Sequence, residues 1–223
     1  MMTLIAIDTS TQTSGLALYD GLQVLAEHSW HGGQHHSVNL APAIDKLLAS
    51  VHLRAADLQV VAVAIGPGSY TGLRIGLALA KGLAFAHKLD LLAVPTLDIL
   101  AAGQPPSELP LAAVLQAGRG RLAVGRYLYK EGWQPQGEPQ LMTAEELTES
   151  IASPTLVSGE LSEDERRTLG RKYKNAVLQT PAWGLRRPAV LAELAWNRWQ
   201  AGERTAPQGL APHYLQASSA VPQ

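Results

Sequence analysis

The sequence predicts an α/β protein built from two lobes, and three features support this fold class. Apolar runs of strand length alternate with segments whose apolar residues recur at helical spacing. An Asp-Gly pair at residues 20–21 is typical of a two-residue hairpin turn. A Pro-rich stretch at residues 104–107 separates two series of such elements. With 223 residues, of which 46% are hydrophobic, the chain is long enough to bury a substantial core.

The first series begins with three predicted strands. Residues 3–9 form a buried apolar run, residues 14–19 form a second, and the Asp20-Gly21 turn leads into a third at residues 23–30. Gly32-Gly33 then ends this part of the sheet. The short turn predicts that the second and third strands pair antiparallel.

Helices and strands alternate after this point. Leu40, Ile44 and Leu47 recur at helical spacing and predict a helix over residues 37–51. A strand at residues 60–65, a helix at 71–87, a strand at 91–95 and a short helix from 97 follow. The order β-β-β-α-β-α-β is that of a ribonuclease H-like lobe.

The second series is weaker and reads as a degenerate copy of the first. We expect a strand at 111–116, a hairpin around 121–129, strands at 155–157 and 176–178, and helices at 143–150, 163–173 and 188–201. Thr143 and Glu146 form a capping-box pattern at the start of the first of these helices. The predicted lobes are therefore residues 1–104 and 105–223, with helix 188–201 a candidate for packing back on the first lobe.

Composition excludes several classes of protein. The chain has no cysteine, so disulfides, thiolate catalysis and Cys-ligated zinc are ruled out. Its apolar stretches are too short for a signal peptide or a membrane span, and we expect a cytoplasmic protein. The net charge of −1 and the scattered basic residues argue against a chain that grips nucleic acid by itself.

The loop at residues 66–72 has two interpretations. Its sequence, Gly-Pro-Gly-Ser-Tyr-Thr-Gly, joins a strand to a helix and is rich in backbone N–H groups. Such a loop serves either to hold an anion at a helix N-terminus or to let another backbone approach closely. It lacks the Gly-Lys-Ser/Thr ending of a P-loop, and either Ser69 or Thr71 is suited to cap the helix.

Three segments together resemble the TsaB (YeaZ) family. They are Ile5-Ala6-Ile7-Asp8-Thr9-Ser10, the run from Gly66 to Gly76 and Lys81-Gly82-Leu83-Ala84, and the similarity covers roughly residues 3–102 well. Pro212-His213-Tyr214-Leu215 adds a family-like motif near the end. The resemblance implies an actin-like ATPase (ASKHA) fold of two lobes. It also implies a role in making threonylcarbamoyladenosine in tRNA, as the partner of the catalytic paralogue TsaD.

In ATPases of this fold, the acid at the position of Asp8 approaches the metal–phosphate end of the nucleotide. The candidates for facing a nucleotide are Asp8, Thr9, Ser10, Gly66, Gly68 and Ser69. The alternative is that Asp8 and Ser10 only cap a turn. We expect no intrinsic cofactor, and ATP or ADP at a subunit interface is the one candidate ligand.

The catalytic paralogue has a metal-binding Asn-His-x-x-Gly-His run after the strand that follows this helix. The aligned residues here run from Pro95 to Leu100, with Thr96 and Leu100 in place of both histidines. That metal site cannot form in this chain, and Ser69 lacks the Gly-x-Ser-x-Gly pattern of a serine hydrolase. We therefore expect no autonomous catalysis. The rival hypothesis is a free-standing ATPase or small-molecule kinase that uses Asp8 and the glycine loop.

The helix over residues 71–87 is apolar nearly all round, so its own sheet cannot cover it alone and a further helix or a partner must pack on it. Small residues recur every four positions along it and predict a closely packed face. That face packs either on the chain's own first helix or also on the equivalent helices of a partner. The predicted interface residues are Leu40, Ile44, Leu47, Leu48, Gly72, Arg74, Gly76, Leu77, Ala80, Leu83 and Ala84. We expect the partners to be a TsaD-like subunit, a TsaE-like ATPase, tRNA indirectly, and a second copy when the chain is alone.

Overall fold

The computed structural model describes residues 2–31, 36–118, 120–171 and 175–215, and it divides into two compact units. Unit 1 combines the residues up to Ile99 with Arg187–His213, and unit 2 combines Leu100–Arg186 with the residues from Tyr214 onward. The Pro-rich stretch at 104–107 thus lies inside unit 2. The part of the chain after Ile99 is divided between the two units, because residues 187–213 belong to unit 1.

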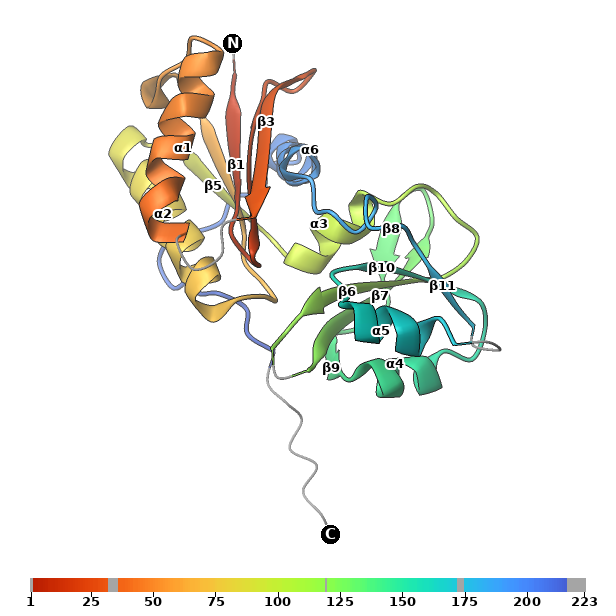
Figure 1. The fold of residues 1–223 in the computed structure, drawn as a ribbon. Coiled ribbons are helices and arrows are strands. Elements are labelled where there is room, and N and C mark those ends of the chain that lie inside the picture. Colours follow the sequence, from red (N-terminus) through yellow and green to blue (C-terminus); the bar gives the residue numbers. More distant parts are fainter. Residues whose placement is uncertain (1, 32–35, 119, 172–174, 216–223) are drawn as a thin grey trace. The chain divides into compact units, whose positions relative to one another are not determined.

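Unit 1 is built on one mixed five-stranded sheet with the order β3-β2-β1-β4-β5 (Figure 1). The first three strands pair antiparallel, and β1, β4 and β5 run parallel. This is the ribonuclease H-like order that the sequence predicts. The strands are β1 (Leu4–Asp8), β2 (Thr13–Tyr19), β3 (Val24–His31), β4 (Val60–Ala64) and β5 (Asp90–Val94).

Helices cover both faces of this sheet because its central strands are apolar on both sides (Figure 1). Ile5 and Ile7 of β1 pack in one core cluster with side chains of α1 (His36–Ser50) and α2 (Tyr70–His87). Leu4 and Ala6 face the other way and pack with α6 (Pro188–Gln200). The short elements η1 (Ala55–Asp57) and α3 (Thr96–Ala102) complete the first series.

A carboxylate from β3 anchors the start of α6. One oxygen of Glu27 accepts a hydrogen bond from Arg187 Nη2 at 2.6 Å, and the other accepts from the backbone N–H of Ala189 at 3.0 Å. The N-cap residue itself, Arg187, makes no side-chain cap. The hydrogen bond to Glu27 raises the pKa of Arg187. Glu27 therefore stabilises the helix end that returns to this unit.

Replacing Glu27 with alanine is expected to lower the free energy of unfolding by about 1–2 kcal/mol, as the loss of a helix N-cap does. Urea denaturation followed by circular dichroism measures the change. Glu193→Ala is the matched control, because Glu193 is an exposed carboxylate on the same helix. Equal stabilities of the two variants would show that the Glu27 contacts contribute nothing.

Unit 2 repeats the strand order of unit 1 on a smaller scale. Its sheet has the order β11-β10-β6-β7-β8, with β9 also pairing with β7. Here β6 takes the place of β1, since β7 pairs with it antiparallel and β10 pairs with it parallel. The strands are β6 (Leu111–Gln116), β7 (Leu122–Tyr129), β8 (Trp133–Pro135), β9 (Gln140–Met142), β10 (Thr155–Gly159) and β11 (Ala176–Leu178).

The helices of unit 2 are short, in keeping with a degenerate second lobe. α4 (Ala144–Ser150) and α5 (Glu163–Leu169) have seven residues each, against 15 in α1 and 18 in α2. The predicted capping box of α4 is present, with Thr143 and Glu146 each accepting the other's backbone N–H. α5 ends at Leu169, with Gly170 as its C-cap, so the predicted extension to residue 173 is wrong for residues 170 and 171.

Some predictions fall outside the described residues. The break at Gly32-Gly33 and the last two residues of the predicted helix 163–173, residues 172 and 173, are among them. Across the described ranges, no helix is both long enough and apolar enough to cross a membrane.

Candidate functional site

The loop between β4 and α2 is held in place by its neighbours in unit 1. Gly66 has a φ of +116°, a backbone conformation that side chains other than glycine rarely adopt. Its N–H donates to Thr96 Oγ1 at 3.0 Å. A Cβ at Gly66 would also overlap the carbonyl oxygen of His213, whose own N–H donates to Ile65 O at 2.7 Å. His213, from the family-like motif near the C-terminus, thus lies directly against this loop.

The turn after β1 packs onto the other side of the loop. Ser69 N donates to the carbonyl oxygen of Ser10 at 2.6 Å, and Thr9 Oγ1 donates to Gly72 O at 2.7 Å. A Cβ at Gly68 would overlap Ser10 O, and one at Gly72 would overlap Thr9 O. These glycines allow two backbone segments to touch. This geometry favours the close-approach interpretation of the loop.

Asp8 is buried, and its carboxylate stabilises the turn after β1. Its Oδ1 accepts hydrogen bonds from the backbone N–H of Ser10 at 2.8 Å and from Ser10 Oγ at 2.5 Å. Asp8, Thr9 and Ser10 are 3% exposed or less. The structure brings all six residues suggested for nucleotide contact together, with Asp8 making the turn-capping contacts of the alternative interpretation.

Ser69 is the N-cap of α2. Its Oγ accepts from the backbone N–H of Gly72 at 3.2 Å, and its carbonyl oxygen accepts from Leu73 N at 3.0 Å. Of the two residues suited to cap this helix, Ser69 takes the role, and Thr71 lies exposed in the first turn. Gly66, Ser69, Gly72 and Leu73 thus all donate their N–H groups within the chain.

The small-residue face of α2 lies inside unit 1, which corrects the interface predicted from the sequence. A Cβ at Gly76 would overlap Thr9 Oγ1, and Ala80 and Ala84 are buried in the core. Nine of the eleven predicted residues are therefore buried by this chain itself and present little surface to a partner. They are Leu40, Ile44, Leu47, Leu48, Gly72, Gly76, Leu77, Ala80 and Ala84.

The reason for this error is physical. A helix that is apolar nearly all round gives no signal for which side faces its own sheet. The polar turn after β1 fills the groove of small side chains, and this contact is not encoded in the periodicity of the helix. Of the predicted set, only Arg74, which is exposed, and Leu83, which is half-buried, reach the surface.

The face of α2 that remains open is the opposite one. Phe85 is 90% exposed and Tyr70 is 60% exposed, which is unusual for aromatic side chains. Arg74 lies over the ring of Tyr70 and donates to its hydroxyl at 2.6 Å. We call the exposed residues at helical spacing the outer α2 stripe: Tyr70, Thr71, Arg74, Ala78, Gly82 and Phe85. The signal for this stripe in the sequence is the pair of aromatic residues, Tyr70 and Phe85, near the two ends of the helix.

The positions that align with the paralogue's histidines have structural roles. Thr96 is fully buried and accepts the N–H of Gly66, and Leu100 is also buried. Within the described part of the chain, no three His, Asp or Glu side chains are grouped as metal ligands. The prediction that the paralogue's metal site is missing rests on these residue types.

Known proteins resemble the chain over nearly its whole length. The family that matches residues 24–194 is described as TsaD, tRNA N6-adenosine threonylcarbamoyltransferase. The tRNA threonylcarbamoyladenosine biosynthesis protein TsaB of Bacillus subtilis is 35% identical over 98% of this chain and 96% of its own length. The chain belongs to the TsaB family. The Escherichia coli TsaB is 29% identical over 70% of the chain and 64% of its own length.

Solved structures agree with this assignment to the TsaB family. YeaZ from Pseudomonas aeruginosa has a TM-score of 0.77 and is 26% identical, covering 96% of this chain and 100% of its own. The ethanolamine utilization protein EutJ from Carboxydothermus hydrogenoformans shares the fold alone, with a TM-score of 0.53 at 17% identity and coverage of 86% and 89%. The two-lobed ASKHA-type fold predicted from the sequence is confirmed.

Proposed function

We propose that this TsaB-family chain is a non-catalytic subunit of the machinery that makes threonylcarbamoyladenosine in tRNA. In this proposal it pairs with a TsaD-type catalytic subunit and works with a TsaE-type ATPase in the cytoplasm. The complex transfers a threonylcarbamoyl group to the adenosine 3′ of the anticodon, in tRNAs that read codons beginning with A. The named relatives support the pathway.

The outer α2 stripe is the observation that carries the subunit role. Exposed Phe85 and Tyr70 flank two small residues, Ala78 and Gly82, which let a second helix approach closely. A Cβ at Gly82 would meet no atom within 4 Å. Neighbouring Ala41, Asp45 and Ala49 form an exposed row on α1. We propose that these two faces receive paired helices of the TsaD-type subunit, or of a second copy when the chain is alone.

The loop geometry supports the absence of intrinsic catalysis. The Asp8 carboxylate accepts hydrogen bonds from Ser10 in the turn after β1. Four N–H groups of the loop and the first turn of α2 donate hydrogen bonds within the chain. A phosphate that used these N–H groups would have to displace these contacts. We therefore propose that the chain has no cofactor of its own, and that any ATP or ADP lies at the interface between subunits.

Reconstitution tests this function. The chain, the TsaD-type subunit and the TsaE-type ATPase of the same organism are mixed with tRNA and threonylcarbamoyl-adenylate, and the modified nucleoside is measured by mass spectrometry. We expect no product from the chain alone, product from the full mixture, and loss of at least 90% of it when the chain is left out, since subunit docking completes the active state. Equal yield without the chain would contradict the subunit role.

A binding measurement on the isolated chain tests the rival hypothesis of a free-standing enzyme. Calorimetry of the isolated chain with ATP and Mg²⁺ is expected to give no binding with a Kd below about 100 μM, which corresponds to weak association. Micromolar binding accompanied by ATP hydrolysis would instead establish a free-standing ATPase or kinase.

A further inference from the structure

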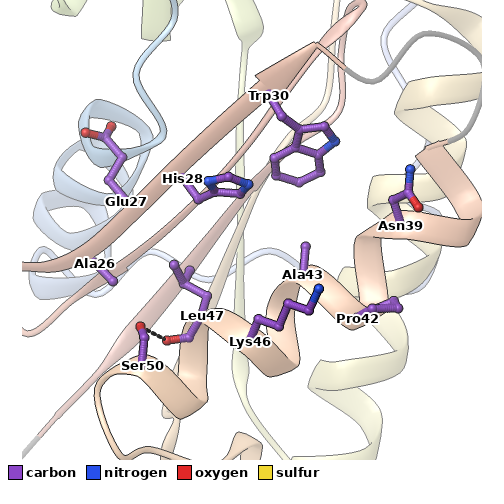
Figure 2. A pocket seen from close by; sticks show the side chains of 10 residues that line it. All are labelled: Ala26, Glu27, His28, Trp30, Asn39, Pro42, Ala43, Lys46, Leu47 and Ser50. Carbon is purple, nitrogen blue, oxygen red and sulfur yellow. Dashed lines mark hydrogen bonds between the residues drawn. The ribbon is translucent and has the colours of Figure 1, made fainter.

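A groove of about 660 Å³ lies between strand β3 and helix α1 in unit 1 (Figure 2). It is separate from the outer α2 stripe and from the Asp8 turn, since none of those residues lines it. We call it the β3–α1 groove. Its lining residues are Ala26, Glu27, His28, Trp30, Asn39, Pro42, Ala43, Lys46, Leu47 and Ser50.

One wall of the groove is the edge of the sheet. β3 is the terminal strand in the sheet order and pairs only with β2 among the strands of the described residues. It has eight residues and contains no Lys, Arg or Pro, the residue types that commonly protect such an edge. An edge of this kind offers backbone N–H and C=O groups to an added strand.

The side chains of the groove suit apolar groups. His28 and Trp30 lie on the same face of β3 and stack, with ring centroids 5.1 Å apart and planes 20° apart. Figure 2 shows both rings on the side of α1, which contributes Pro42, Ala43 and Leu47. A strand added beyond β3 would direct every second side chain toward this same wall, because strand side chains alternate between faces.

Lys46 is the lysine of the groove lining and supplies its positive charge. Glu27 points away from Lys46 in Figure 2, and its carboxylate is bound by Arg187 and the N–H of Ala189. Lys46 is exposed and forms no ion pair with the described residues. It lies between the Asn39 and Ser50 ends of the helix flank, near the middle of the groove. An occupant with a carboxylate between two apolar side chains matches this pattern.

We propose that the β3–α1 groove binds an extended peptide segment of another protein, which adds a strand to β3. The segment presents apolar side chains to the His28–Trp30 wall and an acidic side chain to Lys46. A second copy of this chain fits less well, because its β3 would bring a second Lys46 to the same place. The inference goes beyond the proposed function, since the groove lies on a different flank of α1 from Ala41, Asp45 and Ala49.

The test uses two matched fluorescein-labelled peptides and the full-length chain. The first has the sequence Thr-Val-Thr-Asp-Thr-Val-Thr, which puts both valines and the acid on one strand face in either chain direction. The second has lysine in place of the aspartate. Fluorescence anisotropy is expected to show the acidic peptide binding about tenfold more tightly, the effect of one favourable charge contact. N-methylation of alternate backbone amides is expected to remove the binding if a strand is added.

Charge reversal makes the result specific. Lys46→Glu is expected to reverse the order of the two peptides, and Trp30→Ala is expected to weaken both. Lys130→Glu reverses the charge of an exposed lysine of unit 2 that does not line the groove, and it is expected to leave the order of the two affinities unchanged. Circular dichroism checks that each variant folds, and Lys46→Glu, a surface change, carries the test if Trp30→Ala does not fold.

Several outcomes would overturn the proposal. They are no binding of the acidic peptide up to about 1 mM, an order of affinities that Lys46→Glu does not reverse, and full affinity of the N-methylated peptide. Tighter binding of an octa-uridylate RNA would identify the groove as a nucleic-acid site. Dimerisation that competes with the peptide would identify a second copy as its occupant.

Discussion

Gly72→Ala is expected to destabilise unit 1 by about 3 kcal/mol, at the upper end of the cost of overpacking a closely packed site. The added Cβ would overlap the carbonyl oxygen of Thr9, a backbone atom that cannot rotate away. Thr9 Oγ1 also donates to Gly72 O, so a shift of the helix would break this hydrogen bond. Urea denaturation of the purified variant measures the loss.

Gly82→Ala is the matched control on the same helix. A Cβ at Gly82 would meet no atom within 4 Å, and the residue is exposed. This variant is expected to be more stable than the wild type by about 0.5–1 kcal/mol, because alanine loses less backbone entropy than glycine in a helix. If both variants had the same stability, the contact between α2 and the turn after β1 would be looser than the structure indicates.

Ala78→Arg is expected to weaken association with the TsaD-type subunit by at least about 100-fold, a loss typical of a residue at the centre of an interface. The residue lies on the outer α2 stripe, where a long charged side chain would keep a second helix at a distance. Gly82→Arg is expected to act in the same way. Co-purification and calorimetry with the partner measure the loss, and circular dichroism shows that the helix remains.

Two further variants control this experiment. Gly76→Arg changes the buried face of α2 and is expected to unfold unit 1, so it cannot report on an interface. Val177→Arg changes an exposed apolar residue of unit 2 and is expected to leave association unchanged. Retention of the partner by both stripe variants would move the interface away from α2.

Most of the fold follows from local pattern. β6 and β11 have the predicted bounds, and the strands of unit 1 begin and end within two residues of theirs, because apolar runs end at turn residues such as Gly21 and Gly66. The short strands β8 and β9 were missed. Each of these strands has three residues, and β8 contains a Pro. A segment of this length is too short to show the alternation of apolar and polar residues by which a strand is predicted.

The candidate site was predicted only in part. The sequence brings Asp8, Ser10 and Gly68 to attention as chemistry-bearing or turn residues, and the structure places them in one contact. The sequence does not indicate that the polar groups of these residues form hydrogen bonds with one another. Hydrogen bonds between residues about 60 positions apart depend on the pairing of β1 with β4, which aligns the ends of the two strands.

The sequence by itself determined the alternation of helix and strand, the repeated lobe and the family. These depend on residue types and local spacing, which the chain carries in full. Only the tertiary structure decided which face of α2 is inside. A helix that is apolar nearly all round can turn either side to its sheet, and the Thr9–Ser10 turn fits only the side of Gly72 and Gly76. The opposite side, with Ala78, Gly82 and Phe85, is therefore the one that stays exposed on the surface of unit 1.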